Sequence, residues 1–333
     1  MVMKGMAGSN EKQKSLLRRF LAFYQESDLA KPLIPLIILV AASIALAPRY
    51  FLMPMNIKVI LMQVTPLALI ATGEMFAILM AGIDLSVESA QGLAAMVAAL
   101  LTIQMGGDIA IPILVAIAAA TLVGMINGTI VTKLKVYSFV TTMATYAIFR
   151  AVILIIANKP IWGLHQYEPF KYDYGTYIPI GFVMALLVIF GVYFLMTRTT
   201  FGRIVYGLGS NEEAIRLAGI RADLVKFLAF TIAGVLYGLG GVMLIPMTGE
   251  AVDPWSAYGN MLYAIASCVI GGIALTGGVG HPLGPLMGAF ILVILTNILN
   301  ILGITTIAAQ QIIIGLVLIG AAASLTRGLK YVK

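Results

Sequence analysis

Charged residues are scarce in this 333-residue chain: 11% are Asp, Glu, Lys or Arg, whereas 61% are hydrophobic and the mean hydropathy is +1.01. One globular core could not bury so much apolar surface. Apolar runs of about 17 to 25 residues recur between residues 33 and 325, which is the length that a helix needs to cross a bilayer. The composition therefore excludes a soluble domain and predicts an all-α polytopic membrane protein.

Residues that carry catalysis or bind metals are equally few. The single cysteine, Cys268, cannot form an intrachain disulfide. The two histidines, His165 and His281, lie far apart and lack the cysteine or carboxylate spacing of a metal site. No Gly-x-x-x-x-Gly-Lys-Ser/Thr phosphate loop occurs, because the glycine run at 277–284 lacks the lysine. We therefore expect a chain that is not an enzyme, binds no metal or cofactor and cannot hydrolyse ATP itself.

The apolar runs predict about ten transmembrane helices. Helices are the expected spanning form because each segment must satisfy its own backbone in hydrocarbon, and the runs are too uniformly apolar for barrel strands. The predicted spans are about 33–52, 57–81, 85–105, 109–133, 138–157, 178–196, 226–247, 258–275, 283–303 and 308–325. They form a single transmembrane domain, 33–325, between an N-terminal tail, 1–32, and a C-terminal tail, 326–333.

The basic residues predict the orientation of these spans. With ten spans and the N-terminus inside, sixteen of the twenty-one Lys and Arg residues lie on the inner side, as the positive-inside rule requires. Four lie outside, namely Arg49, Lys58, Lys159 and Lys171. Both termini are thus expected in the cytoplasm of a bacterium or archaeon, with the chain in the cytoplasmic (inner) membrane. The net charge of +7 reflects orientation and attraction to membrane lipids, and it implies no nucleic acid.

A polar, basic loop at 197–226 separates the first six spans from the last four. Ser210 or Asn211 can act as the N-cap of a short helix there. Glu212 and Glu213 then lie in its first turn, where carboxylates meet the positive end of the helix dipole. The spacing predicts a helix of about two turns.

The second half of this helix is also locally encoded. Arg216 follows Glu212 at i+4 and Glu213 at i+3, so an ion pair can brace the helix, and Gly219 can end it with a positive φ. A small apolar surface remains, formed by Ala214, Ile215, Leu217 and Ala218. The residues alone leave two interpretations open: a well-capped solvated loop, or a helix that contacts a partner outside the bilayer.

Several motifs resemble those of a known family. Within the loop, 201–203 (FGR), 209–214 (GSNEEA) and 217–220 (LAGI) are similar to the coupling loop of ribose-, galactose- and xylose-type ABC importer permeases. Further similar segments follow the order of that family at 81–87 (AGIDLSV), 126–128 (ING), 269–272 (VIGG) and 277–280 (GGVG). Glu88 departs from the pattern, because the family usually has a glycine there.

The resemblance implies a type II-like ABC importer permease fold and a function: import of a monosaccharide or similar polyol. The partners that it implies are an ABC ATP-binding subunit that uses ATP and Mg²⁺, a periplasmic or lipid-anchored sugar-binding protein, and a second permease copy, identical or paralogous. The residues implied for coupling to the ATPase are Gly209, Ser210, Asn211, Glu212, Glu213, Ala214, Arg216, Leu217 and Gly219.

Alternative functions stay open. A related permease could carry branched-chain amino acids, nucleosides or a furanosyl signal. A secondary transporter or channel would instead need ion or proton sites within the membrane, and the candidates Glu74, Asp84 and Arg150 show no relay spacing.

Polar groups inside the spans are the candidates for a translocation pathway or gate. A charged side chain costs about 2.5 to 3.5 kcal/mol near the bilayer centre, so it should face a cavity, a partner or an interface. Asp84 or Ser86 can instead cap the third span, and asparagines can form interhelical hydrogen bonds. The candidate pathway residues are Asp84, Ser86, Glu88, Asn127, Asn297 and Asn300.

Two outer segments, 158–177 and 248–257, are rich in aromatic and charged residues. Aromatic belts at the membrane interface are the ordinary explanation. The resemblance adds a docking face for the binding protein, with the candidate residues Lys159, Trp162, Lys171, Glu250 and Asp253.

Small residues four apart predict where helices pack closely. The pairs are Gly124 and Gly128, Gly234 and Gly238, and Gly284 and Gly288.

Overall fold

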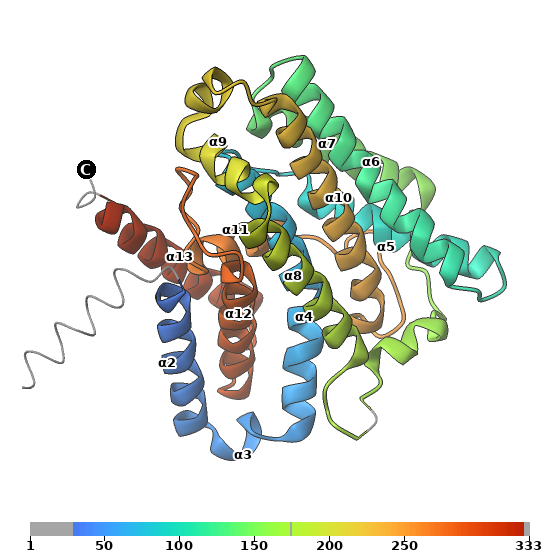
Figure 1. Ribbon diagram of the computed structural model, residues 1–333. Coiled ribbons are helices and arrows are strands. Elements are labelled where there is room, and N and C mark those ends of the chain that lie inside the picture. The colour runs from blue at the N-terminus through green and yellow to red at the C-terminus, as the bar shows by residue number, and fades with distance from the viewer. Residues whose placement is uncertain (1–28, 174, 330–333) are drawn as a thin grey trace, which may run out of the picture.

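A computed structural model describes residues 29–173 and 175–329, and these residues form a helical bundle whose only β-type pairing is one antiparallel bridge between Ile161 and Val252 (Figure 1). The helices are α2 (Ala30–Leu46), α3 (Pro48–Phe51), α4 (Pro54–Leu79), α5 (Val87–Gln104), α6 (Ala110–Lys133), α7 (Ser138–Ile156), the 3₁₀ helix η1 (His165–Lys171), α8 (Ile180–Arg198), α9 (Thr200–Leu217), α10 (Ala222–Met247), α11 (Asn260–Ile270), α12 (Gly284–Ile301) and α13 (Ile307–Leu329).

The ten predicted spans correspond to ten of these helices, and the all-α fold class is confirmed. Within the described residues, seven helices are long and apolar enough to cross a membrane alone: α4, α5, α6, α7, α8, α10 and α12. Residues 1–28 of the predicted N-terminal tail, 1–32, lie outside the described residues, and α2 begins within that tail at Ala30. Residues 330–333 of the predicted C-terminal tail also lie outside the described residues.

Two span boundaries require correction. The span predicted at 258–275 contains only the 11-residue helix α11, because its backbone leaves the helix at Gly271 and Gly272 has φ +85°. The span predicted at 33–52 breaks at Ala47 (φ −143°, ψ 60°), since Pro48 disfavours helical backbone in the residue before it. The short helix α3 follows this break.

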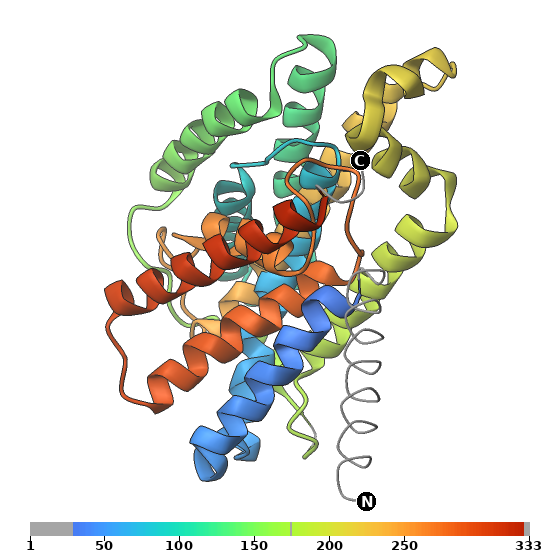
Figure 2. The same ribbon diagram turned by 90° about the vertical axis from the view of Figure 1, so that its left-hand side faces the viewer.

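Among these seven helices, α4 has the most buried apolar stretch, and it packs against α8, α10, α11 and α12. About 78% of its apolar window is buried, compared with 28% for α7 and 33% each for α6 and α8. Two views of the ribbon show α2, α12 and α13 together on one side of the bundle, with α6 and α7 on the other (Figures 1 and 2). Polar side chains on α4, α5 and α10 are therefore shielded from lipid by the outer helices.

The predicted glycine pairs lie where helix backbones meet. A Cβ atom at Gly124 would lie 2.2 Å from the Phe230 carbonyl oxygen, and one at Gly234 would lie 2.6 Å from that of Ala120, so α6 and α10 pack through glycine. A Cβ atom at Gly288 would lie 1.9 Å from the Ser267 oxygen, where α12 crosses α11. The packing role predicted for these residues is confirmed.

Candidate functional site

The predicted loop helix is the second half of α9, beyond a kink at Asn211 (φ −162°, ψ 95°). The Asn211 Oδ1 accepts the Ala214 N–H at 2.9 Å, so Asn211 is the N-cap. Ser210, the other candidate, instead donates its hydroxyl to the Tyr206 carbonyl at 3.1 Å. Gly219 follows the helix with φ +78°, as predicted. The kinked α9 lies at one end of the bundle in Figure 1.

Ion pairs attach this short helix to the start of α10. The Arg216 Nη2 lies 2.8 Å from Glu212 and 2.5 Å from Asp223, and the Lys226 Nζ lies 2.5 Å from Glu212. Burial alone would raise the pKa of Glu212, but hydrogen bonds from Lys226 and Arg216 outweigh it and lower the pKa. Lys135 also pairs with Asp223 at 2.7 Å. The helix is thus held from one side.

The other side of the short helix faces outward. Leu217 is 82% exposed, and Glu213 and Ala214 are exposed beside it. A hollow of about 630 Å³ borders the helix and is lined by the ends of α6 and α9 and the start of α10, including Lys133 and Arg221. A fixed helix with an exposed leucine, next to a basic hollow, can bind a partner at the membrane surface.

Glycine brings α9 against the centre of the bundle. A Cβ atom at Gly209 would lie 1.9 Å from the Leu79 carbonyl oxygen, at the end of α4. The Gly278 N–H donates to that same oxygen at 2.9 Å, and a Cβ atom at Gly278 would lie 2.2 Å from the Ser210 Oγ. The loop before α12, the end of α4 and the kink of α9 are therefore in backbone contact.

Beyond this contact lies a buried polar network between α4, α5, α6 and α10. The Asp84 Oδ1 accepts the Ser86 N–H at 2.9 Å and the Ser86 hydroxyl at 2.6 Å. The Tyr237 hydroxyl lies 3.2 Å from Asp84 Oδ2 and 3.3 Å from Glu74 Oε2, and Glu74 Oε1 accepts the Asp84 N–H at 3.0 Å. Asn127 donates to the Ser86 Oγ at 2.8 Å. We call Glu74, Asp84, Ser86, Asn127 and Tyr237 the central network; all five residues are fully buried.

The central network also explains how α5 begins. Ser86 occupies the N-cap position but makes no side-chain cap bond, whereas Asp84 accepts the Ser86 N–H in a turn before the helix. Thr142 on α7 accepts the Leu85 N–H at 3.0 Å, and Thr145 donates to Asn127 at 2.7 Å. The network thus connects the turn between α4 and α5 to four helices.

The remaining predicted pathway residues lie elsewhere. Asn297 exchanges two hydrogen bonds with Asn56 (2.7 and 3.2 Å), and Asn300 accepts from Gln310 at 2.7 Å. Glu88 accepts the Tyr146 hydroxyl at 3.2 Å. The structure therefore brings Asp84, Ser86 and Asn127 together and separates them from Asn297 and Asn300.

At the end of the bundle opposite to α9, the segments 158–177 and 248–257 pack on each other through the bridge at Ile161 and Val252. Glu250 pairs with Lys171 and His165, and the hydrogen bond from Lys171 is the main reason that the pKa of Glu250 is lowered. The Asp253 Oδ1 accepts the Trp255 N–H at 2.7 Å. Of the five predicted docking residues, Lys159 and Trp162 are exposed. Lys171 and Glu250 join the two loops, and Asp253 closes a turn within its own loop.

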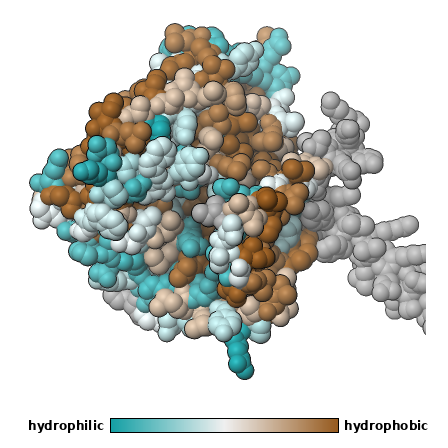
Figure 3. Space-filling view, turned by 180° about the vertical axis from the view of Figure 1, so that it is seen from behind, coloured by the Kyte–Doolittle hydropathy of each residue, from teal (hydrophilic) through white to brown (hydrophobic). Residues whose placement is uncertain are grey.

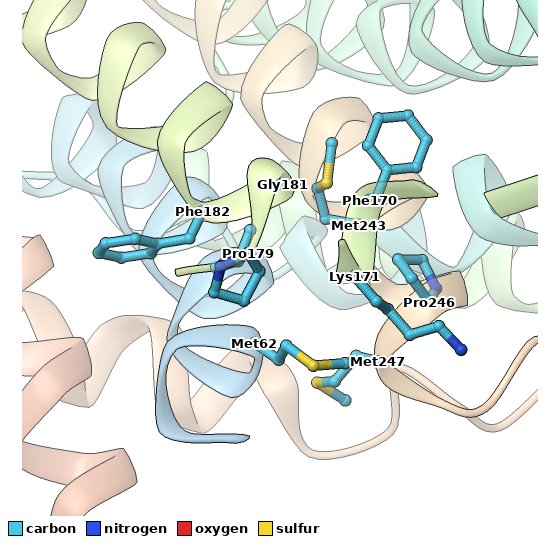
Figure 4. A pocket seen from close by; sticks show the side chains of 10 residues that line it. Met62, Phe170, Lys171, Pro179, Gly181, Phe182, Met243, Pro246 and Met247 are labelled. Carbon is cyan, nitrogen blue, oxygen red and sulfur yellow. The ribbon is translucent and has the colours of Figure 1, made fainter. Parts of the chain in front are cut away.

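A small hollow lies near these loops, between η1 and the ends of α4, α8 and α10 (Figure 4). Its volume is about 10 Å³, and its lining is mostly apolar, with Met62, Phe182 and Met247 among the labelled side chains. It holds at most one water molecule and is too small for a sugar.

Seen from behind, the surface of the molecule is mixed rather than uniformly apolar, with teal and white residues between brown areas (Figure 3).

Sequence reasoning missed Tyr237, Tyr146 and Gln91 as members of polar contacts. Gln91 accepts from Asn260 at 2.8 Å at the start of α11. A tyrosine in the middle of an apolar run, such as Tyr237, is the signal that could have found the central network, because a buried hydroxyl needs a partner.

Comparison with known proteins agrees with this architecture. The profile of the family described as "Branched-chain amino acid transport system / permease component" matches residues 56–322. The chain is 36% identical to the D-allose transport system permease protein of Escherichia coli K12, over 86% of this chain and 88% of that protein. It is 35% identical to the ribose import permease of Bacillus subtilis 168 (86% and 89%) and 30% identical to the L-arabinose transport system permease of Escherichia coli K12 (80% and 81%).

Proposed function

We propose, from the premise that this chain belongs to the family of branched-chain amino acid transport system permease components, that it is the membrane-spanning subunit of an ATP-driven importer for a monosaccharide or similar polyol. The relatives named for D-allose, ribose and L-arabinose support a sugar as solute. The chain itself is a non-catalytic transport subunit, and a separate ATP-binding subunit uses ATP and Mg²⁺.

The capped helix after Asn211 is the observation that carries this proposal. Its ion pairs fix one face on α10, and its other face exposes Leu217 and Glu213. A rigid, exposed helix outside the bilayer fits a cleft in an ATPase. We assign coupling to this helix and to Gly209. Gly209 packs directly on the end of α4, so a movement of the helix is transmitted to α4.

The route from the coupling helix to the spans follows from the same contacts. A displacement of α9 acts on Gly278 and Leu79, and through the turn after α4 it reaches Asp84. The central network joins that turn to α6, α7 and α10, so it can couple helix movement to an inner gate. Asn297 and Asn300 stay in the proposal only as interhelical contacts.

The outer loops are proposed to receive the binding protein. Lys159 and Trp162 supply exposed contact groups, while the Glu250–Lys171 pair and Asp253 preserve the shape of the surface. The bilayer is the cytoplasmic (inner) membrane with both termini in the cytoplasm, and a second permease copy completes the pathway.

The test is reconstitution of the chain with its ATPase and binding protein in proteoliposomes. We expect ATP-dependent uptake of at least one of D-allose, D-ribose and L-arabinose. Uptake of branched-chain amino acids and of none of the three sugars would replace the sugar assignment, while uptake without ATP, driven by an ion gradient, would contradict the transport class.

A further inference from the structure

Arg150 of α7 is a buried cation whose donors are only partly used. It is 7% exposed, and its Nη1 donates to the Pro254 carbonyl at 2.7 Å. Its Nε and Nη2 are buried without a hydrogen-bond partner, and none of the ion pairs within the described ranges includes Arg150. An unpartnered buried donor costs about 1 to 3 kcal/mol, more on a charged group, so these N–H groups indicate an absent acceptor.

One exposed aromatic ring lies on this guanidinium, and a second lies against the first. The Arg150 Cζ is 3.7 Å from the centre of the Trp255 ring, and the Trp255 and Tyr258 rings meet edge to face with centres 5.9 Å apart. Trp255 is 52% exposed and Tyr258 is 67% exposed. Aromatic faces beside a few unused donors are the usual composition of a small-molecule site.

The charges around Arg150 favour a neutral ligand. Tyr146, one turn before Arg150 on α7, donates to Glu88, and the Glu88 Oε2 accepts the Gly259 N–H at 2.8 Å. Glu88 and Arg150, which have side chains of opposite charge type, thus both act on the same tyrosine, Tyr146. An anionic solute would gain from Arg150 but would meet Glu88, whereas hydroxyl groups can bond to either residue.

We propose that Arg150, Trp255 and Tyr258 form a contact site for a neutral sugar ring at the outer end of the transmembrane domain. The apolar face of the ring stacks on Trp255 and Tyr258, and adjacent hydroxyl oxygens accept hydrogen bonds from Arg150 once the Trp255 side chain moves off the guanidinium. Arg150 lies six residues, about 9 Å, before the end of α7 that leads to the outer loops. The inference rests on the proposed function, because it supplies the first sugar contact within the importer.

The test uses the reconstituted complex and measures uptake of D-allose, D-ribose and L-arabinose. Trp255→Leu and Arg150→Lys should lower uptake of the preferred sugar about tenfold and change the ratio of the three uptake rates. Trp255→Phe should keep most of the uptake rate and leave the ratio nearly unchanged. Tyr50→Leu is the matched control, since Tyr50 is also an exposed aromatic (65%) and belongs to no proposed site. A folding defect lowers all three rates together and leaves their ratio unchanged.

A second measurement does not depend on the rate of transport. Tyr258→Cys in a Cys268→Ala background carries one cysteine, and the preferred sugar should slow its labelling by a membrane-impermeant maleimide. Unchanged uptake ratios in Trp255→Leu, together with unprotected Cys labelling, would overturn the site while sugar import by the wild type stands. If the Trp255→Leu complex instead loses the second permease copy or the binding protein while the ratio of the three uptake rates is unchanged, the sugar site is overturned. The residues would then form a protein-docking face. If the wild type takes up none of the sugars, the proposed function fails and this site with it.

Discussion

Polar groups in this chain occur in two settings that differ in their access to water. In the central network, Asp84 and Glu74 are fully buried, and their hydrogen bonds come from neutral donors. At the two ends of the bundle, Glu212 and Glu250 each pair with two basic side chains and keep contact with solvent. Bonds in the dry setting have no water to replace them, so losing one strands its partner. Bonds at the ends exchange with water, and each contributes little alone.

Asp84→Leu should show the largest effect, because it leaves the Ser86 N–H and the Ser86 hydroxyl without their acceptor and the Tyr237 hydroxyl with Glu74 alone. At about 1 to 3 kcal/mol for each stranded group, the two Ser86 donors together cost about 2 to 6 kcal/mol, a large part of the about 5 to 15 kcal/mol that stabilises a typical domain. We expect the variant not to assemble in the membrane, as measured by size-exclusion chromatography of a fluorescent fusion. Asp84→Asn, which keeps the shape, should assemble. Wild-type yields of Asp84→Leu would show that the central network is not stabilising.

Gly209→Ala tests the contact between α9 and the end of α4, which links the exposed ion pairs to the central network. Its Cβ would lie 1.9 Å from a backbone oxygen, whereas the Cβ of Gly207→Ala would meet only the flexible end of Ile215 at 2.7 Å. We expect Gly209→Ala to cost about 1 to 3 kcal/mol and to uncouple ATP hydrolysis from uptake. Gly207→Ala should remain coupled and gain up to about 1 kcal/mol from helix propensity. Melting temperature and the ratio of sugar transported to ATP hydrolysed measure both effects, and equal behaviour of the two variants would contradict the steric argument.

Two neighbouring glutamates on the short helix after Asn211 distinguish contacts that hold this helix in place from contacts that it is proposed to make with the ATPase. Glu212 binds Arg216 and Lys226, whereas Glu213 is exposed. Glu213→Ala should reduce sugar-stimulated ATP hydrolysis about tenfold, equivalent to about 1.4 kcal/mol of lost contact, without lowering the melting temperature. Glu212→Gln should instead lower the melting temperature slightly. The reverse pattern would show that the exposed face of the helix does not touch the ATPase.

The smallest effect is expected from pH at the outer loops. Because pairing with Lys171 lowers the pKa of Glu250 from its ordinary value of 4.5, the pair stabilises the folded loops above pH 4.5 and loses this contribution as the pH falls through the folded-state pKa. The advantage of the wild type over Glu250→Gln should be about 0.2 to 1 kcal/mol at pH 7 and should vanish at lower pH. Thermal unfolding at several pH values measures it. A difference that stays constant as the pH falls would exclude ionisation as its cause.

The short helix after Asn211 was predictable from sequence because its determinants are local. Asn211 caps a residue three positions on, Glu212 and Arg216 are four apart, and Gly219 directly ends the turn. The central network was not predictable, because Tyr237 lies 153 residues from Asp84 and nothing in the sequence pairs them. Spacing identified Asp84 as either a cap or a gate residue, but only the fold shows which donors fill its two oxygens.

The outer loops show the same limit. Composition marked Lys171 and Glu250 as charged surface residues, yet they lie 79 positions apart and satisfy each other. Apolar content also overestimated the eighth span, since hydropathy counts Gly271 and Gly272 as neutral and does not register that the helix ends there. Where the chain folds back depends on the backbone contact between Gly271 and Gly284, which is tertiary.

The short helix α11 constrains how the protein is made. Its 11 residues are about 16 Å long, whereas the hydrocarbon core is about 30 Å thick. The backbone that continues from it bonds to protein instead of lipid, as the Ala274 N–H does to Val279 and the Gly278 N–H does to Leu79. This segment is therefore too short to be inserted stably as an independent span, and its stable insertion depends on the contacts that α4 and α12 provide.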